Sequence, residues 1–172
     1  ASTAGEGVMA YEIGERLGFY RQEGTRIEVA VAKISTAVQA ILGGSADYLN
    51  HGSIFPLILT GLPFKVLLVN YDKSPHYLVA SAKIANFTDL IGKTVAVDDF
   101  TGMAALTMRE ALVKKGVPLN QVQLRVIGPP HLRFQALLAG AVDAAPLTYL
   151  QSKDAQQKGF RLLAFTGDFI SE

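Results

Sequence analysis

The stretch QALLAGAVDAA, residues 135–145, closely repeats an earlier stretch, QAILGGSADYL, residues 39–49. Both contain Gln-Ala, two aliphatic residues, a Gly, a small residue and an Asp in the same order, 96 positions apart (135 minus 39). A sequence that recurs within one chain predicts that one structural unit is used twice. The residues that flank each copy indicate which unit it is.

The first copy is flanked by the signals of a strand, a helix and a second strand. RIEVAVA, residues 26–32, has the length and β-branched content of a strand. Ser35 or Thr36 is placed to cap a helix, because a side-chain oxygen can accept a hydrogen bond from an unpaired backbone N–H of the first turn. The glycines at 43–44 are expected to end that helix, and ADYLN, residues 46–50, is expected to form a short strand.

The second copy has the same flanks. VQLRVI, residues 122–127, is the expected strand, and Pro129 and Pro130 mark the helix start, where the missing proline N–H would be unpaired in any case. Gly140 is expected to close the helix, and VDAAPL, residues 142–147, continues as a strand. Each copy is therefore predicted to be a strand–helix–strand unit with parallel strands and a right-handed connection.

The rest of the chain alternates between helical and strand patterns, which places the protein in the α/β class. In the helix expected at 102–115, Met103, Leu106, Ala111 and Leu112 are expected to face inward and Gly116 to stop the helix. The other expected helices are 6–21, ending near Gly24, a short turn at 88–90, and 149–158; the other expected strands are a buried one at 64–70, and 76–81, 93–98 and 160–165.

One boundary divides the chain. The polar stretch Tyr71-Asp72-Lys73-Ser74-Pro75 lies between two expected strands, with one copy of the repeat on each side. We therefore expect two lobes that use the same strand–helix–strand unit, each with its helix start directed toward a shared cleft.

Composition limits the function. The 172 residues are 49% hydrophobic and 18% charged, with a net charge of +1 and dispersed Lys and Arg, which argues against nucleic-acid binding. The absence of Cys removes disulfides, thiolate catalysis and Cys-based zinc sites, and is compatible with an extracytoplasmic protein and with a cytosolic enzyme. Polar residues or Gly interrupt every apolar run before the length of a membrane span. No signal peptide opens the sequence, so a secreted protein would be present here in processed or trimmed form.

Four expected helix starts are rich in hydroxyl groups or small residues. Such starts carry unpaired N–H groups and partial positive charge, and in open α/β sheets they lie at the carboxyl ends of strands, where ligands bind. The pattern favours a small anion such as a carboxylate, a sulfonate or nitrate, although each Ser or Thr by itself is explained as a simple cap. The starts are Ser2-Thr3-Ala4-Gly5, Ser35-Thr36, His51-Gly52-Ser53 and Thr101-Gly102-Met103.

The histidines and one acidic pair have alternative interpretations. His51, His76 and His131 lack metal-ligand spacing, so neither a metal nor a cofactor is expected. His51 either contacts a ligand or is an ordinary loop residue. His131 and Arg133 either supply positive charge to an anion or form a solvated first helical turn. Asp98-Asp99 is a weak candidate for acid–base catalysis, because adjacent strand residues point to opposite faces.

Long stretches of the sequence resemble a known family, the substrate-binding proteins of ABC importers for nitrate, taurine and alkanesulfonates. RLGFYRQEGTRIEVAVAK, STAVQAILGGSADY and TGLPFKVLLV are similar to the first lobe of that family. FTDLIGKTVAVDDFTGMAALTMREALVKKGV, QALLAGAVDAA and KGFRLLAFTGD are similar to the second lobe. The resemblance covers almost the whole chain.

The resemblance implies a two-lobed periplasmic-binding-protein fold of type II, incomplete at both ends, that closes on a ligand and delivers it to a membrane permease. Residues 1–71 would form a partial first lobe, 72–76 the interlobe crossing, 77–165 the second lobe and 166–172 a return segment. The implied location is periplasmic or extracytoplasmic, at the membrane through the permease. The ligand loops carried over are Ser2, Thr3, Ser35, Thr36, Gly52, Ser53, Tyr71, Thr101, Gly102, Met103 and the turn at Pro129-Pro130, to which His51 and His131 are added as candidates.

The chain also departs from the family. It begins at or after the first ligand loop, it stops near the return to the first lobe, and Ala145-Pro146-Leu147-Thr148 replaces the aromatic-acidic-Pro turn of many members. A first lobe short of strands would have an unpaired edge that favours self-association. Two other functions stay open: an enzyme of the same fold related to thiamine pyrimidine precursor synthesis, and a ligand-sensing domain.

Overall fold

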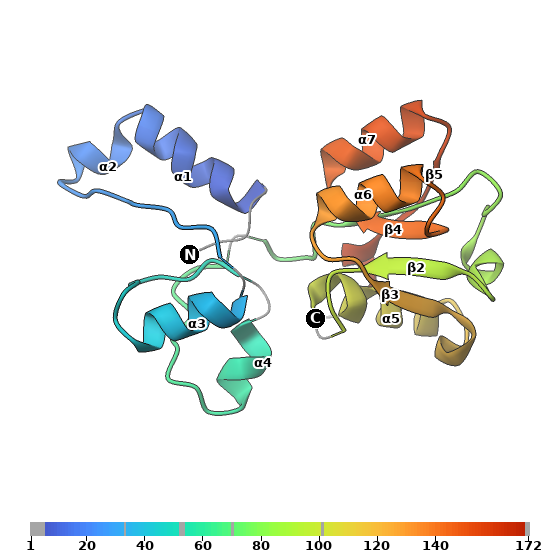
Figure 1. Cartoon of the computed structure of the whole chain (residues 1–172), viewed down its shortest axis with the longest axis horizontal. Helices are drawn as coiled ribbons and strands as arrows, with labels where there is room; N and C mark the ends of the chain where they lie inside the picture. The colour runs from blue at the N-terminus through green and yellow to red at the C-terminus, as the bar shows by residue number, and fades with distance from the viewer. Residues whose placement is uncertain (1–5, 33, 52–53, 70, 101, 171–172) are drawn as a thin grey trace. The chain divides into compact units, whose positions relative to one another are not determined.

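The computed structural model of the chain describes residues 6–32, 34–51, 54–69, 71–100 and 102–170. The chain divides into two compact units, Ala1–Phe64 and Lys65–Glu172, here called the first unit and the second unit (Figure 1). The division falls a few residues before the crossing expected at 72–76.

The second unit is built on a five-stranded mixed sheet. Its strands are β1 (Tyr77–Ala80), β2 (Thr94–Val97), β3 (Gln123–Val126), β4 (Ala144–Leu147) and β5 (Arg161–Phe165), in the order β3-β2-β4-β1-β5. Strand β2 pairs in parallel with β3 and β4, whereas β1 pairs antiparallel with β4 and β5. The carboxyl ends of β2, β3 and β4 therefore lie at the same edge of the sheet as the beginning of β1.

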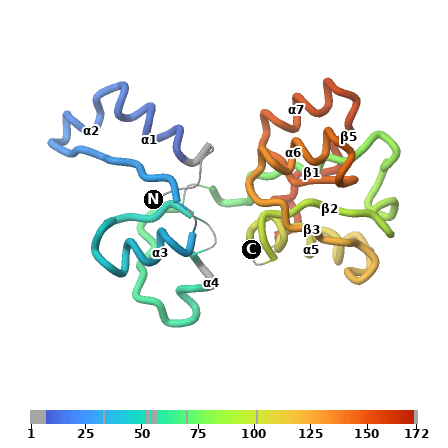
Figure 2. Tube along the Cα trace, in the orientation of Figure 1, coloured from blue at the N-terminus to red at the C-terminus, as the bar shows by residue number. Residues whose placement is uncertain are grey.

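Helices cover both faces of this sheet. Helices α6 (Pro130–Leu138) and α7 (Tyr149–Gln157) lie on one face and α5 (Met103–Lys114) lies on the other (Figures 1 and 2). Three 3-10 helices connect the larger elements: η1 (Phe87–Leu90), η2 (Leu119–Gln121) and η3 (Thr166–Phe169).

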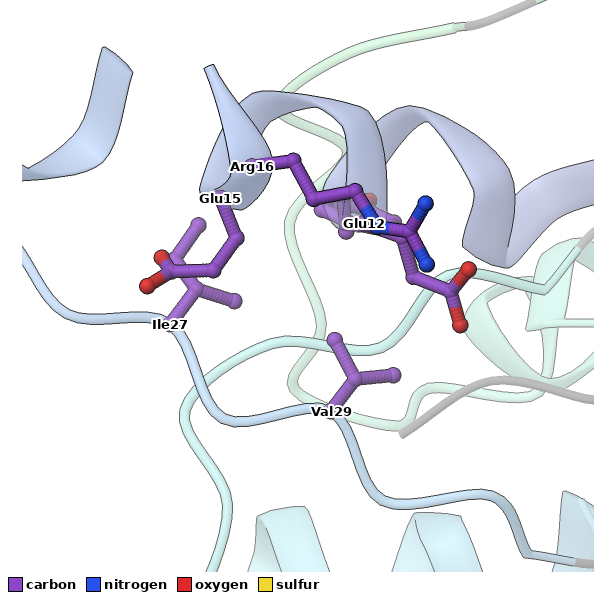
Figure 3. Close-up of a pocket in the computed structure, with 6 residues that line it drawn as sticks. Glu12, Glu15, Arg16, Ile27 and Val29 are labelled. Atoms are coloured by element: carbon purple, nitrogen blue, oxygen red, sulfur yellow. The ribbon is translucent and has the colours of Figure 1, made fainter. Parts of the chain in front are cut away.

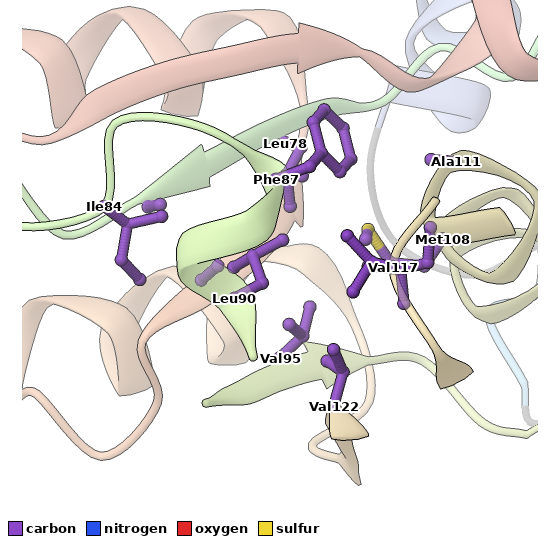
Figure 4. Packing of buried hydrophobic residues seen from close by; sticks show 12 residues of the cluster. Leu78, Ile84, Phe87, Leu90, Val95, Met108, Ala111, Val117 and Val122 are labelled. Atoms are coloured by element: carbon purple, nitrogen blue, oxygen red, sulfur yellow. The ribbon is translucent and has the colours of Figure 1, made fainter. Parts of the chain in front are cut away.

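The core of the second unit follows from the alternation of side chains along each strand. Leu78 and Val95 point into a cluster with Met108 of α5, in which the side chains of several elements converge (Figure 4). The intervening residues Val79 and Ala96 point into a second cluster on the α6–α7 face. Two apolar layers thus hold the sheet between its helices.

The repeat in the sequence is a repeat in the structure. Helix α3 (Ile34–Leu42) in the first unit and α6 in the second unit have the same length, and their bounds differ by 96 positions (130 minus 34). Gly44 and Gly140 follow them with φ of 71° and 70°. The residue after each glycine donates its N–H to an equivalent carbonyl, Ser45 to Ala40 and Ala141 to Ala136, both at 2.9 Å. The predicted glycine stops are confirmed in both copies.

The second copy also has the predicted strands. Strands β3 and β4 flank α6 and are parallel to each other, since each is parallel to β2, which lies between them. The predicted helix start at Pro130 and the predicted strands and helices of residues 76–165 are likewise present.

The first unit differs from the expectation. It contains α1 (Glu6–Arg16), α2 (Phe19–Gln22), α3 and α4 (Ile54–Leu59), and its described residues contain single-residue bridges at Val31 and Asn50 instead of strands. The strands predicted at 26–32 and 46–50 are therefore wrong over their described residues, and the strand predicted at 64–70, most of which belongs to the second unit, is also wrong over residues 64–69. A β-prone segment becomes a strand only when a neighbouring strand accepts its backbone hydrogen bonds, and the described part of this unit supplies no such ladder.

The prediction of a buried strand at 64–70 is also wrong for residues 65–69, which begin the second unit and are exposed. The exposed fractions of the side chains are 73% for Leu67 and 78% for Leu68, and Val66 and Val69 are exposed as well. Among the described residues of the first unit, the buried apolar side chains are those of Ala37 and Val38 in α3. The described part of the first unit therefore has only a small core.

Three local predictions need correction. Gly18, with φ of 75°, interrupts the helix predicted at 6–21, because its left-handed conformation ends the first helix and precedes α2. Leu106 faces outward, 42% exposed, while Thr107 and Met108 face the core, since the helix turns by 100° per residue. Helix α3 begins at Ile34, so Ser35 and Thr36 lie inside its first turn and not at its cap.

None of the helices in the described ranges combines the length and the apolar character that crossing a bilayer requires.

Candidate functional site

The candidate site lies at the carboxyl ends of β2, β3 and β4 in the second unit. Each of these strands leads directly into a helix, β2 into α5, β3 into α6 and β4 into α7. Three helix starts, each with partial positive charge, are therefore brought to one edge of the sheet. This edge is where ligands bind in open α/β sheets.

The start of α5 is occupied by a carboxylate of the chain itself. Asp98, directly after β2, accepts hydrogen bonds from the backbone N–H groups of Ala104 and Ala105, both at 3.3 Å. Gly102 makes this arrangement possible, because a Cβ at that position would overlap the Asp98 carboxyl group. Asp98 therefore caps a helix, which gives this carboxylate a structural role.

The start of α7 is closed by a reciprocal capping box. The hydroxyl of Thr148 accepts a hydrogen bond from the N–H of Gln151 at 3.5 Å, and the amide oxygen of Gln151 accepts one from the N–H of Thr148 at 3.3 Å. Two N–H groups of the first turn are thus satisfied within the chain.

The start of α6 has a different construction. Pro129 occupies the cap position without a side-chain hydrogen bond, and Arg133 in the first turn is only 1% exposed. The Arg133 guanidinium donates from Nε to the carbonyl of Pro146 at 2.9 Å and from Nη1 to the carbonyl of Gly128 at 2.7 Å. Its Nη2 is buried and has no hydrogen-bond partner within the described part of the chain. One donor of a buried cation is thus left unpaired at this helix start.

A neutral histidine lies near this cation. Burial lowers the pKa of His76 to about 4, the charge of Arg133 acts in the same direction, and Asp98 opposes both. Its Nδ1 is 3.0 Å from the hydroxyl of Ser74. Burial also lowers the pKa of Arg133 to about 10, against the effect of Asp98. At neutral pH the cluster therefore contains a protonated guanidinium and a neutral imidazole.

The predicted site residues fall into three groups. The structure brings Gly102, Met103, Pro130 and His131 to the strand ends of the second unit; Gly102 is buried and His131 is exposed. In the first unit, Ser35 and Thr36 are exposed in α3, and His51 lies just before α4, whereas Tyr71 is an exposed residue of the segment that leads into β1. The predicted residues Ser2, Thr3, Gly52, Ser53 and Thr101 lie outside the described residues.

Sequence reasoning named Arg133 as a candidate source of positive charge but missed its burial. Interpreting Arg133 as part of a solvated helical turn is wrong, because its side chain is folded beneath α6. The repeat contained the signal: position 133 corresponds to position 37 (133 minus 96), and Ala37 is buried in the first copy. An arginine at a helix position that is buried in the other copy of the repeat is therefore expected to be a buried cation. His76 and Ser74 carried no comparable sequence signal.

Two open surface grooves lie elsewhere. The first, about 340 Å³, runs in the first unit between α1 and the extended segment that contains Ile27 and Val29, with Glu12 and Arg16 above it (Figure 3). The second, about 400 Å³, is lined in the second unit by η1, η3, β5 and Lys115. Neither groove includes Arg133 or His76. Within the described residues, no group of three or more acidic, His or Cys side chains is arranged to hold a metal ion.

Comparison with known proteins identifies the family and the fold. A sequence model described as NMT1/THI5 like matches residues 8–168. A solved protein of Bordetella bronchiseptica has 22% identity and a TM-score of 0.73, over 94% of this chain and 54% of its own. The alkanesulfonate-binding protein of Xanthomonas axonopodis pv. citri, bound to MOPS, has 22% identity and a TM-score of 0.69, over 95% and 58%.

The periplasmic aliphatic sulphonate-binding protein of Escherichia coli is similar to the same degree, with 19% identity and a TM-score of 0.69, over 99% of this chain and 57% of its own. The chain thus spans a little over half the length of these three structures. A search of curated proteins finds no match. At these identities the likeness establishes the fold, which is that of periplasmic binding proteins.

Proposed function

The chain belongs to the NMT1/THI5-like family, and from this premise we propose that it is the solute-binding component of an ABC importer. Its solute is a small organic or inorganic anion, such as a sulfonate, nitrate or a carboxylate. Residues 1–71 and 77–165 serve as two lobes joined by the crossing at 72–76, and 166–172 are the return segment. The protein acts outside the cytoplasmic membrane and delivers its solute to a membrane permease.

One observation carries the proposal: three helices start at the carboxyl edge of the second unit's sheet, beside the buried guanidinium of Arg133. Helix starts and a buried cation both favour negative charge. The same helix, with the same glycine stop, recurs in the first unit as α3. The repeat supports a protein in which two related lobes contribute to one site.

An enzyme of the same fold is the second candidate, and one contact favours it. Ser74 and His76 are at hydrogen-bond distance, as in a nucleophile–base pair. Two features weaken this interpretation. Ser74 is only 4% exposed, and the pKa of His76, about 4, makes its imidazole a weak base at neutral pH. We therefore prefer binding without turnover.

A screen of solutes tests the proposal. Nitrate, short alkanesulfonates, taurine, small carboxylates and pyrimidines are added to the purified chain, and the unfolding temperature and the heat of binding are measured. A solute-binding protein is stabilised by its solute in proportion to the logarithm of the ratio of solute concentration to Kd. Stabilisation by one anion, recovered chemically unchanged by mass spectrometry, is the expected result. Conversion of the solute would favour the enzyme, and no response to any anion would contradict the proposal.

A further inference from the structure

We propose that the anion is recognised at the start of α6, with Arg133 as the charged donor, and that this position prefers a singly charged oxyanion to a doubly charged one. This inference rests on the proposed function, because it assigns the charge-bearing residue and the ligand class of the same site. Among the helix starts that the sequence proposed, it assigns the recognition of the anion to the start of α6.

The three helix starts at the strand ends differ in what they can still offer. The first N–H groups of α5 already bind the carboxylate of Asp98, so a second anion there would meet a fixed negative charge. At the start of α7, the N–H groups of Thr148 and Gln151 are engaged by the reciprocal capping box. A helix start that is already capped by its own chain has less positive potential left for a ligand.

The start of α6 has no side-chain cap, although Pro130 has no N–H and the N–H of Leu132 bonds to the carbonyl of Pro129 at 3.1 Å. Its cap residue, Pro129, has no side-chain hydrogen bond. The helix is nine residues long and therefore has a helix dipole. Arg133 adds a full charge at the same end, since its Nη1 binds the carbonyl of Gly128, two residues before the helix begins. Helix dipole and guanidinium therefore act in the same direction at this one start.

The unpaired Nη2 of Arg133 is the second, independent observation. Arginine donates through five N–H bonds, and a buried donor without an acceptor is unfavourable. Nε and Nη1 are held by Pro146 and Gly128, which fixes the plane of the guanidinium. An oxyanion oxygen that reaches Nη2 would supply the missing acceptor to a donor that is already oriented. Pre-orientation of this kind favours binding, because little side-chain freedom is lost.

The burial of Arg133 and the proximity of Asp98 set the charge of the ligand. A solute that contacts a 1% exposed guanidinium must itself be largely enclosed, as ligands in binding pockets are. In such a place each charge needs a counter-charge. The field of Asp98 already offsets part of the Arg133 charge, and His76 is neutral. One further negative charge is therefore stabilised by the rest of the Arg133 charge together with the start of α6, whereas a second negative charge would have no counter-charge.

A pair of probes of almost the same shape tests the charge preference. Methanesulfonate carries one negative charge and sulfate carries two, and both present tetrahedral S–O groups. With wild-type chain whose arginines carry ¹⁵N, methanesulfonate is expected to shift the guanidinium signal of Arg133 and to bind more tightly than sulfate. Tighter binding of sulfate would overturn the charge preference, and an unshifted Arg133 signal during saturable binding would overturn the assignment of Arg133.

Variants test the residue independently. Arg133→Met is expected to weaken methanesulfonate binding by about tenfold or more, because the buried charge is removed, and Arg133→Lys should recover part of the affinity. Arg125→Met is the matched control: Arg125 also donates to a backbone carbonyl, that of Ala141 at 3.1 Å, but it is exposed on β3. The affinity of the Arg125→Met variant for methanesulfonate should equal that of the wild type.

The outcomes separate this inference from the proposed function. Equal methanesulfonate affinity in the wild type and in a folded Arg133→Met variant would overturn the inference and leave solute binding intact. If Arg133→Met fails to fold, the methanesulfonate affinity of Arg133→Lys and the NMR signal of Arg133 in the wild type decide whether Arg133 binds the anion. If the wild type binds neither probe, the inference is wrong, and the solute screen alone decides the proposed function.

Discussion

The carbonyl oxygen of His76 accepts two hydrogen bonds from Thr166, one from its backbone N–H at 2.8 Å and one from its Oγ1 at 2.9 Å. His76 directly precedes β1 and Thr166 directly follows β5, so these bonds join the point where the chain enters the sheet to the point where it leaves. Thr166 is fully buried. The paired β1–β5 ladder is thereby extended by one position beyond Tyr77 and Phe165.

Thr166→Val removes one of these bonds and keeps the shape of the side chain. We expect the free energy of unfolding to fall by about 1 kcal/mol, the net contribution of a typical hydrogen bond. Chemical denaturation measures the change. Thr25→Val is the control, because Thr25 is exposed and its hydroxyl donates a hydrogen bond to the carbonyl of Glu23, two residues away. Equal effects of the two substitutions would show that the Thr166 bond does not stabilise the second unit.

Asp98 and Gly102 are predicted to be coupled. Gly102→Ala alone should destabilise the second unit by about 1–3 kcal/mol, because the new Cβ would overlap the Asp98 carboxyl group. Asp98→Ala alone should cost about 1 kcal/mol through the lost cap of α5. In the double variant the alanine at 102 should be tolerated, so the two effects should not add. Additive free energies of unfolding would contradict the contact.

The lowered pKa of His76 predicts that the folded protein loses stability in mild acid. Its pKa is lowered from 6.5 to about 4 by burial first and by Arg133 second, with Asp98 opposing. Between these values the unfolded chain binds more protons than the folded chain, so the free energy of unfolding rises with pH. The contribution of neutral His76 is complete above about pH 6.5 and is lost as the pH falls toward 4, by at most about 3 kcal/mol.

Denaturation curves measured from pH 4 to pH 7, together with the NMR titration of the imidazole, check this prediction. His76→Gln should flatten the pH dependence, because it replaces the titrating group with a neutral hydrogen-bonding side chain. In Arg133→Met the pKa of His76 should rise, since a nearby positive charge is removed. A wild-type His76 that titrates at its ordinary pKa would contradict the burial and charge environment described above.

The exposed apolar segment of residues 66–69 predicts self-association of the chain. The side chains of Leu67 and Leu68 are mostly exposed, and their backbone is not part of a ladder. Unpaired, apolar extended segments favour pairing with other chains. Leu68→Lys should lower the apparent mass in sedimentation at high concentration and leave the unfolding of the second unit unchanged. Lys65→Ala is a neighbouring control outside the apolar run, and a concentration-independent monomer in the wild type would refute the prediction.

Local sequence signals were sufficient to predict most helices and strands of the second unit. Pro130 begins α6 and Gly140 ends it because a proline at the first position and a glycine after the last are favourable whatever surrounds them. The same applies to Gly116 after α5. Burial around the helix was less predictable: Leu106 was expected inside, but the orientation of α5 on the sheet turns Thr107 and Met108 inward.

The candidate site could be predicted only in outline. The sequence located two helix starts that the structure brings to one edge of the sheet, those at Gly102 and Pro130. It did not show that Asp98 occupies the first, nor that the second has Arg133 beneath it. Both facts depend on which groups meet after folding.

By itself, the sequence determined the α/β class, the strand–helix–strand unit of the second copy and the helix with its glycine stop that recurs 96 positions apart, because these follow from periodicity and from the conformations open to proline and glycine. Tertiary structure alone decided which extended segments became strands. It also decided that Arg133 is buried with one nitrogen unpaired and that His76 is neutral. Strand pairing and desolvation depend on groups that are far apart in the chain, and a local sequence pattern does not identify those neighbours.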